Sequence, residues 1–212
     1  MDSAQFHKMC SSVACGLPVR PDSSYWEFVV KSTLFLSLLA CGLLAHPAPL
    51  KAQTESGPAA GSKVEALKVA VATGDDTGKE IDFAVQRKDK PTIVVFVQAD
   101  KWDRPLARFL RTLDQDLAKD RQDVHIVAVW LTDDVDKAKE YLPKAQQSLK
   151  LSQTTFTVHP GDKNGPRAWA INADAHLTAV LADSGKVTAS FGYRSVNEED
   201  VPAVLKKLKP KK

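Results

Sequence analysis

The pattern of apolar and polar positions along the chain predicts an α/β domain between residues 64 and 208. Three short runs, at 91–98, 124–131 and 154–158, are apolar almost throughout and rich in β-branched residues. Such runs are typical of strands that are buried on both faces of a sheet. We therefore expect three central strands, separated by longer segments in which apolar residues recur at helical spacing.

Two further pairs of strands are predicted near the ends of this domain. Residues 67–72 and 80–85 flank a segment rich in glycine and aspartate, which signals a turn, so the domain should open with a β-hairpin. Residues 176–182 and 187–193 are joined by Asp183-Ser184-Gly185-Lys186, which favours a tight turn. We expect a second hairpin there.

The clearest predicted helix follows the first central strand. Its apolar residues fall on one stripe: Leu106, Phe109, Leu110, Leu113 and Leu117. Asp103 precedes this stripe and is expected to cap the helix. Further helices are predicted at 132–149, where Pro143 should kink or break the helix, at 167–171, and after Asn197.

The first 52 residues are expected to form a leader with a signal peptide. The apolar segment 34–45 matches the core of a secretion signal, and Leu50-Lys51-Ala52 offers a cleavage site. We therefore expect an exported protein, periplasmic or secreted. Two alternatives stay open: Leu38-Leu39-Ala40-Cys41 resembles the lipobox of bacterial lipoproteins, and an uncut leader would anchor the chain. The membrane is a partner only in these two cases. Residues 53–63 are rich in Pro, Ala, Gly and Ser, which predicts a flexible linker.

Composition excludes several classes of function. All three cysteines, Cys10, Cys15 and Cys41, lie in the expected leader, so the domain contains no redox pair, thiol nucleophile or cysteine metal ligand. The net charge of +3 comes from the C-terminus, where five lysines occupy the last seven residues and 209–212 form a basic tail. The rest of the chain after residue 52 is slightly acidic, so we expect no nucleic-acid partner.

The order of the predicted elements resembles the thioredoxin-like superfamily, including its exported thiol-disulfide reductases and redoxins. In that family a buried strand leads to W-C-G-P-C or W-C-P-P-C, which opens a long helix. Here the strand TIVVFV is followed by Trp102-Asp103-Arg104-Pro105-Leu106. The family's later strand and D-G-K turn are matched by 178–187. The resemblance covers about residues 64–208. It implies a mixed central sheet with helices on both faces, preceded by the N-terminal β-hairpin.

The departures from the family pattern decide which chemistry is expected. Asp103 and Leu106 stand where the family has its two cysteines, and the family's cis-proline would fall at His176 or Leu177. Disulfide exchange requires a thiolate that attacks and a second thiol that resolves the mixed disulfide. No catalytic residue and no cofactor is therefore carried over. We expect a redox-inactive module that binds an envelope protein or peptide at the former active-site rim. The expected binding residues are Trp102, Asp103, Arg104, Pro105 and His176.

Two other functions stay open. A non-thiol enzyme, hydrolytic or metal-assisted, would use Asp103, Asp174 and His176 at the same rim, because a carboxylate can orient an imidazole as a general base. A thiol-free subunit of a redox complex would instead act on its partner's cysteines. The sequence contains no HExxH, P-loop, G-x-S-x-G or dinucleotide-binding motif. The pattern therefore favours a binding module over an enzyme and predicts no metal site.

Overall fold

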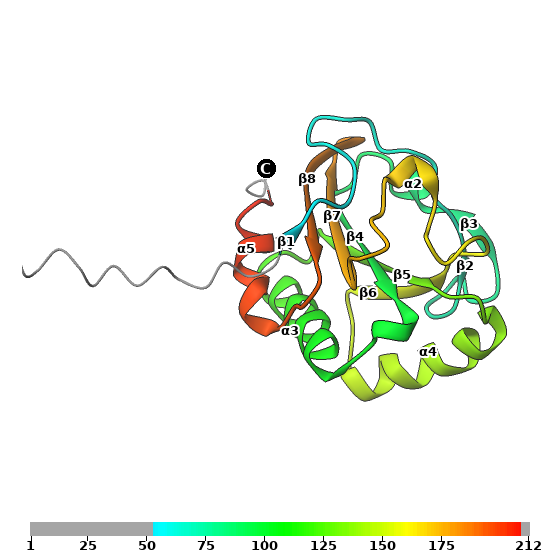
Figure 1. Ribbon diagram of the computed structural model, residues 1–212. Coiled ribbons are helices and arrows are strands. Elements are labelled where there is room, and N and C mark those ends of the chain that lie inside the picture. Colours follow the sequence, from blue (N-terminus) through cyan, green and yellow to red (C-terminus); the bar gives the residue numbers. More distant parts are fainter. Residues whose placement is uncertain (1–52, 209–212) are drawn as a thin grey trace, which may run out of the picture. The chain divides into compact units, whose positions relative to one another are not determined.

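A mixed sheet of eight strands forms the centre of the computed structural model, which describes residues 53–208 (Figure 1). The expected leader, its signal segment and the basic tail at 209–212 lie outside the described residues. The strands are β1 (Gln53–Thr54), β2 (Lys68–Val71), β3 (Glu80–Asp82), β4 (Thr92–Gln98), β5 (His125–Leu131), β6 (Thr154–Val158), β7 (Leu177–Asp183) and β8 (Lys186–Tyr193). The helices are α2 (Phe83–Arg87), α3 (Arg104–Asp120), α4 (Val135–Leu149) and α5 (Val201–Leu205), with 3-10 turns η1 (Ala99–Lys101), η2 (Arg167–Trp169) and η3 (Glu198–Asp200).

The strands lie in the order β1-β8-β7-β4-β5-β6-β2-β3. The three predicted central strands, β4, β5 and β6, are parallel to one another, and the predicted hairpins β2–β3 and β7–β8 are antiparallel. Every residue of β4 is buried, which explains its uninterrupted apolar pattern. The predicted mixed sheet and its N-terminal hairpin are confirmed.

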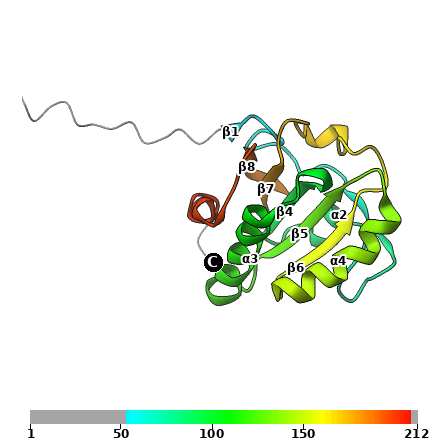
Figure 2. The same ribbon diagram turned by 60° about the horizontal axis from the view of Figure 1, so that its bottom comes forward.

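Helices cover both faces of the sheet, but unequally. Figures 1 and 2 show α3 and α4 on the same side, and α5 packs beside α3. The connections β4-α3-β5 and β5-α4-β6 step across the sheet in the same direction, so right-handed crossovers bring both helices to one face. The other face is covered by Phe83 of α2, Trp169 of η2 and the coil around Leu67. Within the described part of the chain, no helix is both long and apolar enough to cross a bilayer.

The segment at 53–63, expected to be a flexible linker, is instead part of the folded domain. Thr54 of β1 pairs with Gly192 of β8, and Gly61 N donates to the carbonyl oxygen of Val187 at 2.8 Å. Gly57 has φ +95°, and a Cβ there would approach the Cβ of Ser190 to 2.8 Å, so glycine is required. Backbone hydrogen bonds of this kind do not require apolar side chains at regular spacing. The sequence pattern therefore placed the start of the domain at residue 64.

Two element boundaries also differ from the prediction. The strand expected over 80–85 ends at Asp82, because the Asp82 carboxylate accepts a hydrogen bond from Ala84 N at 3.0 Å and caps α2. Helix α4 begins at Val135 and continues through Pro143 to Leu149, so of the two expectations, a kink or a break, the break does not occur.

One buried carboxylate ties α3 to the start of β6. Asp114 is only 1% exposed, and it accepts hydrogen bonds from Ser152 N (2.9 Å), Gln153 N (2.9 Å) and Thr154 Oγ1 (2.7 Å). All three donors lie at or just before the first residue of β6. Asp114 therefore sets the position of α3 relative to the sheet.

Replacing Asp114 with alanine should lower the free energy of unfolding by about 2–4 kcal/mol, because two partly buried backbone N–H groups and the buried Thr154 hydroxyl would lose their acceptor. Urea denaturation followed by circular dichroism measures the loss. The matched control is Gln115→Ala, an exposed neighbour on the same helix, for which we expect a change within about 0.5 kcal/mol. Equal effects of the two changes would contradict this role of Asp114.

The predicted stripe of α3 is entirely buried, and Asp103 Oδ1 accepts a hydrogen bond from Leu106 N at 2.9 Å, as expected of an N-cap. Leu110→Ala should therefore cost about 2–5 kcal/mol of unfolding free energy. Asp103→Ala should cost only about 0.5–2 kcal/mol, the range for a lost cap. The same denaturation experiment compares them, and an Asp103→Ala loss as large as that of Leu110→Ala would show that Asp103 does more than cap α3.

Candidate functional site

The carboxyl ends of the parallel strands meet the first turns of two helices. Strand β4 ends at Gln98 and leads through η1 and Trp102 into α3, and β5 ends at Leu131 just before α4. In open α/β sheets, ligands bind in the crevice outside the carboxyl ends of the strands. A ligand site is therefore expected at this edge of the sheet.

Three aromatic side chains from three elements meet at this edge. The indole Nε1 of Trp102 donates a hydrogen bond to Tyr141 Oη at 2.9 Å. The ring centroids of Trp102 and Trp130 lie 4.9 Å apart in an edge-to-face arrangement, and those of Trp130 and Tyr141 lie 6.2 Å apart. We call Trp102, Trp130 and Tyr141 the aromatic rim. Because Trp130 is buried beneath the other two, their positions are fixed by packing as well as by the hydrogen bond.

The aromatic rim lines an open cavity of about 410 Å³. Three charged residues also line it: Asp100 before α3, and Asp134 and Lys137 at the start of α4. The Asp134 carboxylate is engaged as the cap of α4, where it accepts a hydrogen bond from Lys137 N at 3.1 Å. The cavity thus combines aromatic faces with both signs of charge, which suits a peptide-like ligand better than a simple ion.

The residues predicted from the sequence lie at this edge, but only Trp102 lines the cavity. Asp103 and Arg104 are exposed on the first turn of α3, and Pro105 is partly buried there. His176 lies beside the end of β4, since its carbonyl oxygen accepts a hydrogen bond from Gln98 N at 3.1 Å. The His176 segment therefore pairs with the end of β4, four residues before Trp102, and its side-chain contact with the start of α3 stays a prediction.

The side chains at this edge are grouped differently from the prediction. Trp102 packs on Trp130 of β5 and Tyr141 of α4, whereas His176 lies on the β7 side of β4. Asp174, which the sequence placed near Asp103, forms an ion pair with Arg194 at 2.8 Å. Within residues 53–208, no three His, Cys, Asp or Glu side chains lie close enough together to hold a metal ion. No peptide bond in this range is cis, including the one between His176 and Leu177.

Sequence reasoning missed Trp130 and Tyr141. Trp130 lies inside an apolar run and Tyr141 on a helix of mixed polarity, so neither stood out by its local pattern. Tyr141 is 42% exposed, which is unusual for a large apolar side chain in this domain. The only local signal for the site was Trp102, at the position of the tryptophan in the family motif.

The comparisons with known proteins concern the fold. No protein-family model matches the sequence, and no curated protein is significantly similar to it. Solved structures do match. One is described as a thiol:disulfide interchange protein DsbE from Chlorobium tepidum; it is 19% identical, the match covers 70% of this chain and 94% of that chain, and the TM-score is 0.53.

Two further structures match to a similar degree. The thioredoxin domain of a thiol-disulfide oxidoreductase from Bacteroides vulgatus is 18% identical over 71% of this chain and 97% of that chain, with a TM-score of 0.52. A DsbF homologue from Corynebacterium diphtheriae is 15% identical over 77% and 97% of the two chains, with a TM-score of 0.51. The structural neighbours are thus thioredoxin-like redoxin proteins, and the domain described here has the thioredoxin-like fold.

Proposed function

We propose that this protein is an exported, redox-inactive thioredoxin-like module that binds a protein or peptide at the aromatic rim. The observation that carries the proposal is the meeting of Trp102, Trp130 and Tyr141 around a cavity at the carboxyl ends of β4 and β5. Export is supported by the apolar segment at 34–45, which matches the core of a secretion signal.

Redox inactivity is supported by the residues that replace the cysteines of the family motif. The Asp103 carboxylate is used as a helix cap, and Leu106 is buried in the core that α3 forms with the sheet. Neither side chain can attack a disulfide or resolve a mixed one. The first turn of α3 therefore contributes to stability rather than to thiol chemistry.

Peptide binding is supported by the geometry and chemistry of the aromatic rim. Tryptophan and tyrosine supply most of the energy at many protein interfaces, because a large rigid ring loses little conformational entropy on binding. The bond between Trp102 and Tyr141 holds both rings in place before any ligand arrives. The exposed guanidinium of Arg104 lies on the first turn of α3, two residues after Trp102, and offers a charged contact for the same partner.

A test of redox inactivity compares the full chain with a variant in which Cys10, Cys15 and Cys41 are all replaced by serine. We expect insulin reduction and peroxide consumption by both proteins to equal the blank without protein. The leader cysteines do not form a C-x-x-C pair, and the domain contains no thiol. Turnover by the serine variant would contradict the proposal.

The binding site is tested with peptides selected from a random display library on the wild-type protein. For a selected peptide, Trp102→Ala should raise the Kd by about tenfold or more, as truncation of an interface hot spot does. Calorimetric titration measures the Kd. The control is Val85→Ala, which removes an apolar side chain that is 71% exposed on α2. An unchanged Kd for Trp102→Ala, or an equal loss for Val85→Ala, would place binding elsewhere.

A further inference from the structure

A second polar cavity, of about 240 Å³, lies at the opposite end of the central strands. Among its lining residues are Arg87 at the end of α2 and His125, the first residue of β5. The seven residues of β4 span about 23 Å, and the aromatic rim follows their carboxyl end. The two cavities are therefore separate sites.

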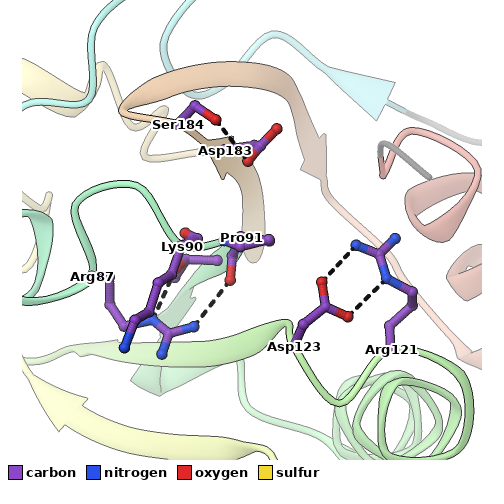
Figure 3. A network of polar contacts seen from close by, with 8 residues as sticks. Arg87, Lys90, Pro91, Arg121, Asp123, Asp183 and Ser184 are labelled. Atoms are coloured by element: carbon purple, nitrogen blue, oxygen red, sulfur yellow. Dashed lines mark hydrogen bonds and ion pairs between the residues drawn. The ribbon is translucent and has the colours of Figure 1, made fainter. Parts of the chain in front are cut away.

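Arg87 lines this cavity as a half-buried cation. Its Nε donates to Thr92 Oγ1 and its Nη2 donates to the carbonyl oxygen of Pro91, both at 3.1 Å (Figure 3). Both acceptors are neutral, and Arg87 forms no ion pair with a carboxylate in the part of the chain that the structure describes. Burial lowers the pKa of Arg87, as expected where a charge is desolvated without compensation.

Arg121, also drawn in Figure 3, is another partly buried arginine, and its charge is paired with a carboxylate. Its guanidinium makes two hydrogen bonds of 3.0 Å to the carboxylate of Asp123, and this pairing raises the pKa of Arg121. Two arginines thus lie near the amino ends of the central strands, and among residues 53–208 a carboxylate balances the charge of Arg121 but not that of Arg87. The guanidinium of Arg87 is fixed in place, and its remaining N–H groups are left for an acceptor from outside.

His125 and Thr155 add neutral hydrogen-bonding groups to the cavity. His125 Nε2 lies 3.0 Å from Thr155 Oγ1, and His125 N donates to the Pro91 carbonyl that also accepts from Arg87. Burial, together with the charge of Arg87, lowers the pKa of His125 to about 4, against a smaller opposing effect of Asp114. The imidazole is therefore neutral at neutral pH.

The other charged residues that line the cavity are Lys90, Asp75 and Asp76. The Asp76 carboxylate already accepts hydrogen bonds from Lys79 Nζ at 2.8 Å and Gln86 Nε2 at 3.1 Å, so its charge is largely satisfied. Asp75 lies exposed in the turn between β2 and β3. Lys90 adds a second cation, so positive charge prevails on the side of the cavity formed by Arg87 and Lys90.

We propose that this cavity binds a small oxyanion, a phosphate or carboxylate group, with Arg87 and Lys90 supplying the charge and the hydrogen-bonded pair of His125 and Thr155 supplying one further donor. An oxyanion gives the guanidinium the counterion that it lacks, and its oxygens match the planar N–H pattern of arginine. This site is independent of the peptide-binding function proposed for the aromatic rim.

The proposal is tested by NMR on the full chain, titrated with sodium phosphate against sodium chloride at equal ionic strength. Phosphate, but not chloride, should give saturable shifts of the Arg87 Nε–H and His125 ring signals. Bound phosphate should also raise the pKa of His125 from about 4, because a nearby anion favours the charged imidazole. A parallel titration with sodium acetate distinguishes a site for both oxyanions from one for phosphate alone. The proposal is overturned if neither oxyanion saturates the shifts.

Substitutions of single residues test whether Arg87 and Lys90 bind the phosphate. Arg87→Gln should weaken phosphate binding by about tenfold or more, whereas Arg121→Gln, which removes the paired arginine, should leave it unchanged. Arg87→Gln should by itself raise the pKa of His125, and phosphate should then add little. Should Arg87→Gln fail to fold, Lys90→Gln changes an exposed side chain and should still weaken binding by about threefold. Wild-type affinity in a folded Arg87→Gln or Lys90→Gln variant would show that the phosphate binds elsewhere.

Discussion

The pairing of β4 with β5 is the constraint on which the rest of the domain depends. The two strands are parallel and in register over their whole length, from Thr92 opposite His125 to Gln98 opposite Leu131. Both are buried on both faces, so neither can shift without exposing apolar side chains. Because their ends are aligned, the pair presents two edges: the aromatic rim lies at the carboxyl end, and the cavity with Arg87 lies at the amino end.

At the carboxyl ends of β4 and β5, the geometry of the fold is kept although the two cysteines of the family motif are absent. The start of α3 is stabilised by the Asp103 cap and by the buried stripe, both of which depend on packing and hydrogen bonding rather than on thiols. Function belongs to sites placed on folds, so a different set of side chains can supply a different function at the same edge. Here the neighbouring side chains are aromatic, and Trp102 is held by Tyr141.

The two cavities differ in the chemistry that they offer. At the carboxyl end, acids cap α3 and α4, and the cavity combines aromatic side chains with Asp100 and Lys137. At the amino end, a half-buried guanidinium is held by neutral oxygen atoms and lacks a carboxylate partner among the described residues. These environments differ in charge and in aromatic content, so the two ligands that we propose, a peptide and an oxyanion, would bind at opposite ends of the same strands.

By itself, the sequence determined the central strands, the two hairpins and the helix that begins after Asp103, because burial imposes a period on the apolar residues. It also determined that the domain has no thiol. Only the tertiary structure decided that residues 53–63 join the sheet, that Asp114 ties α3 to β6, and that Trp102 packs with Tyr141 rather than with His176. These contacts join segments far apart in the sequence through single hydrogen bonds or ring contacts. Such contacts impose no regular spacing of apolar residues on the local sequence, so they cannot be predicted from it.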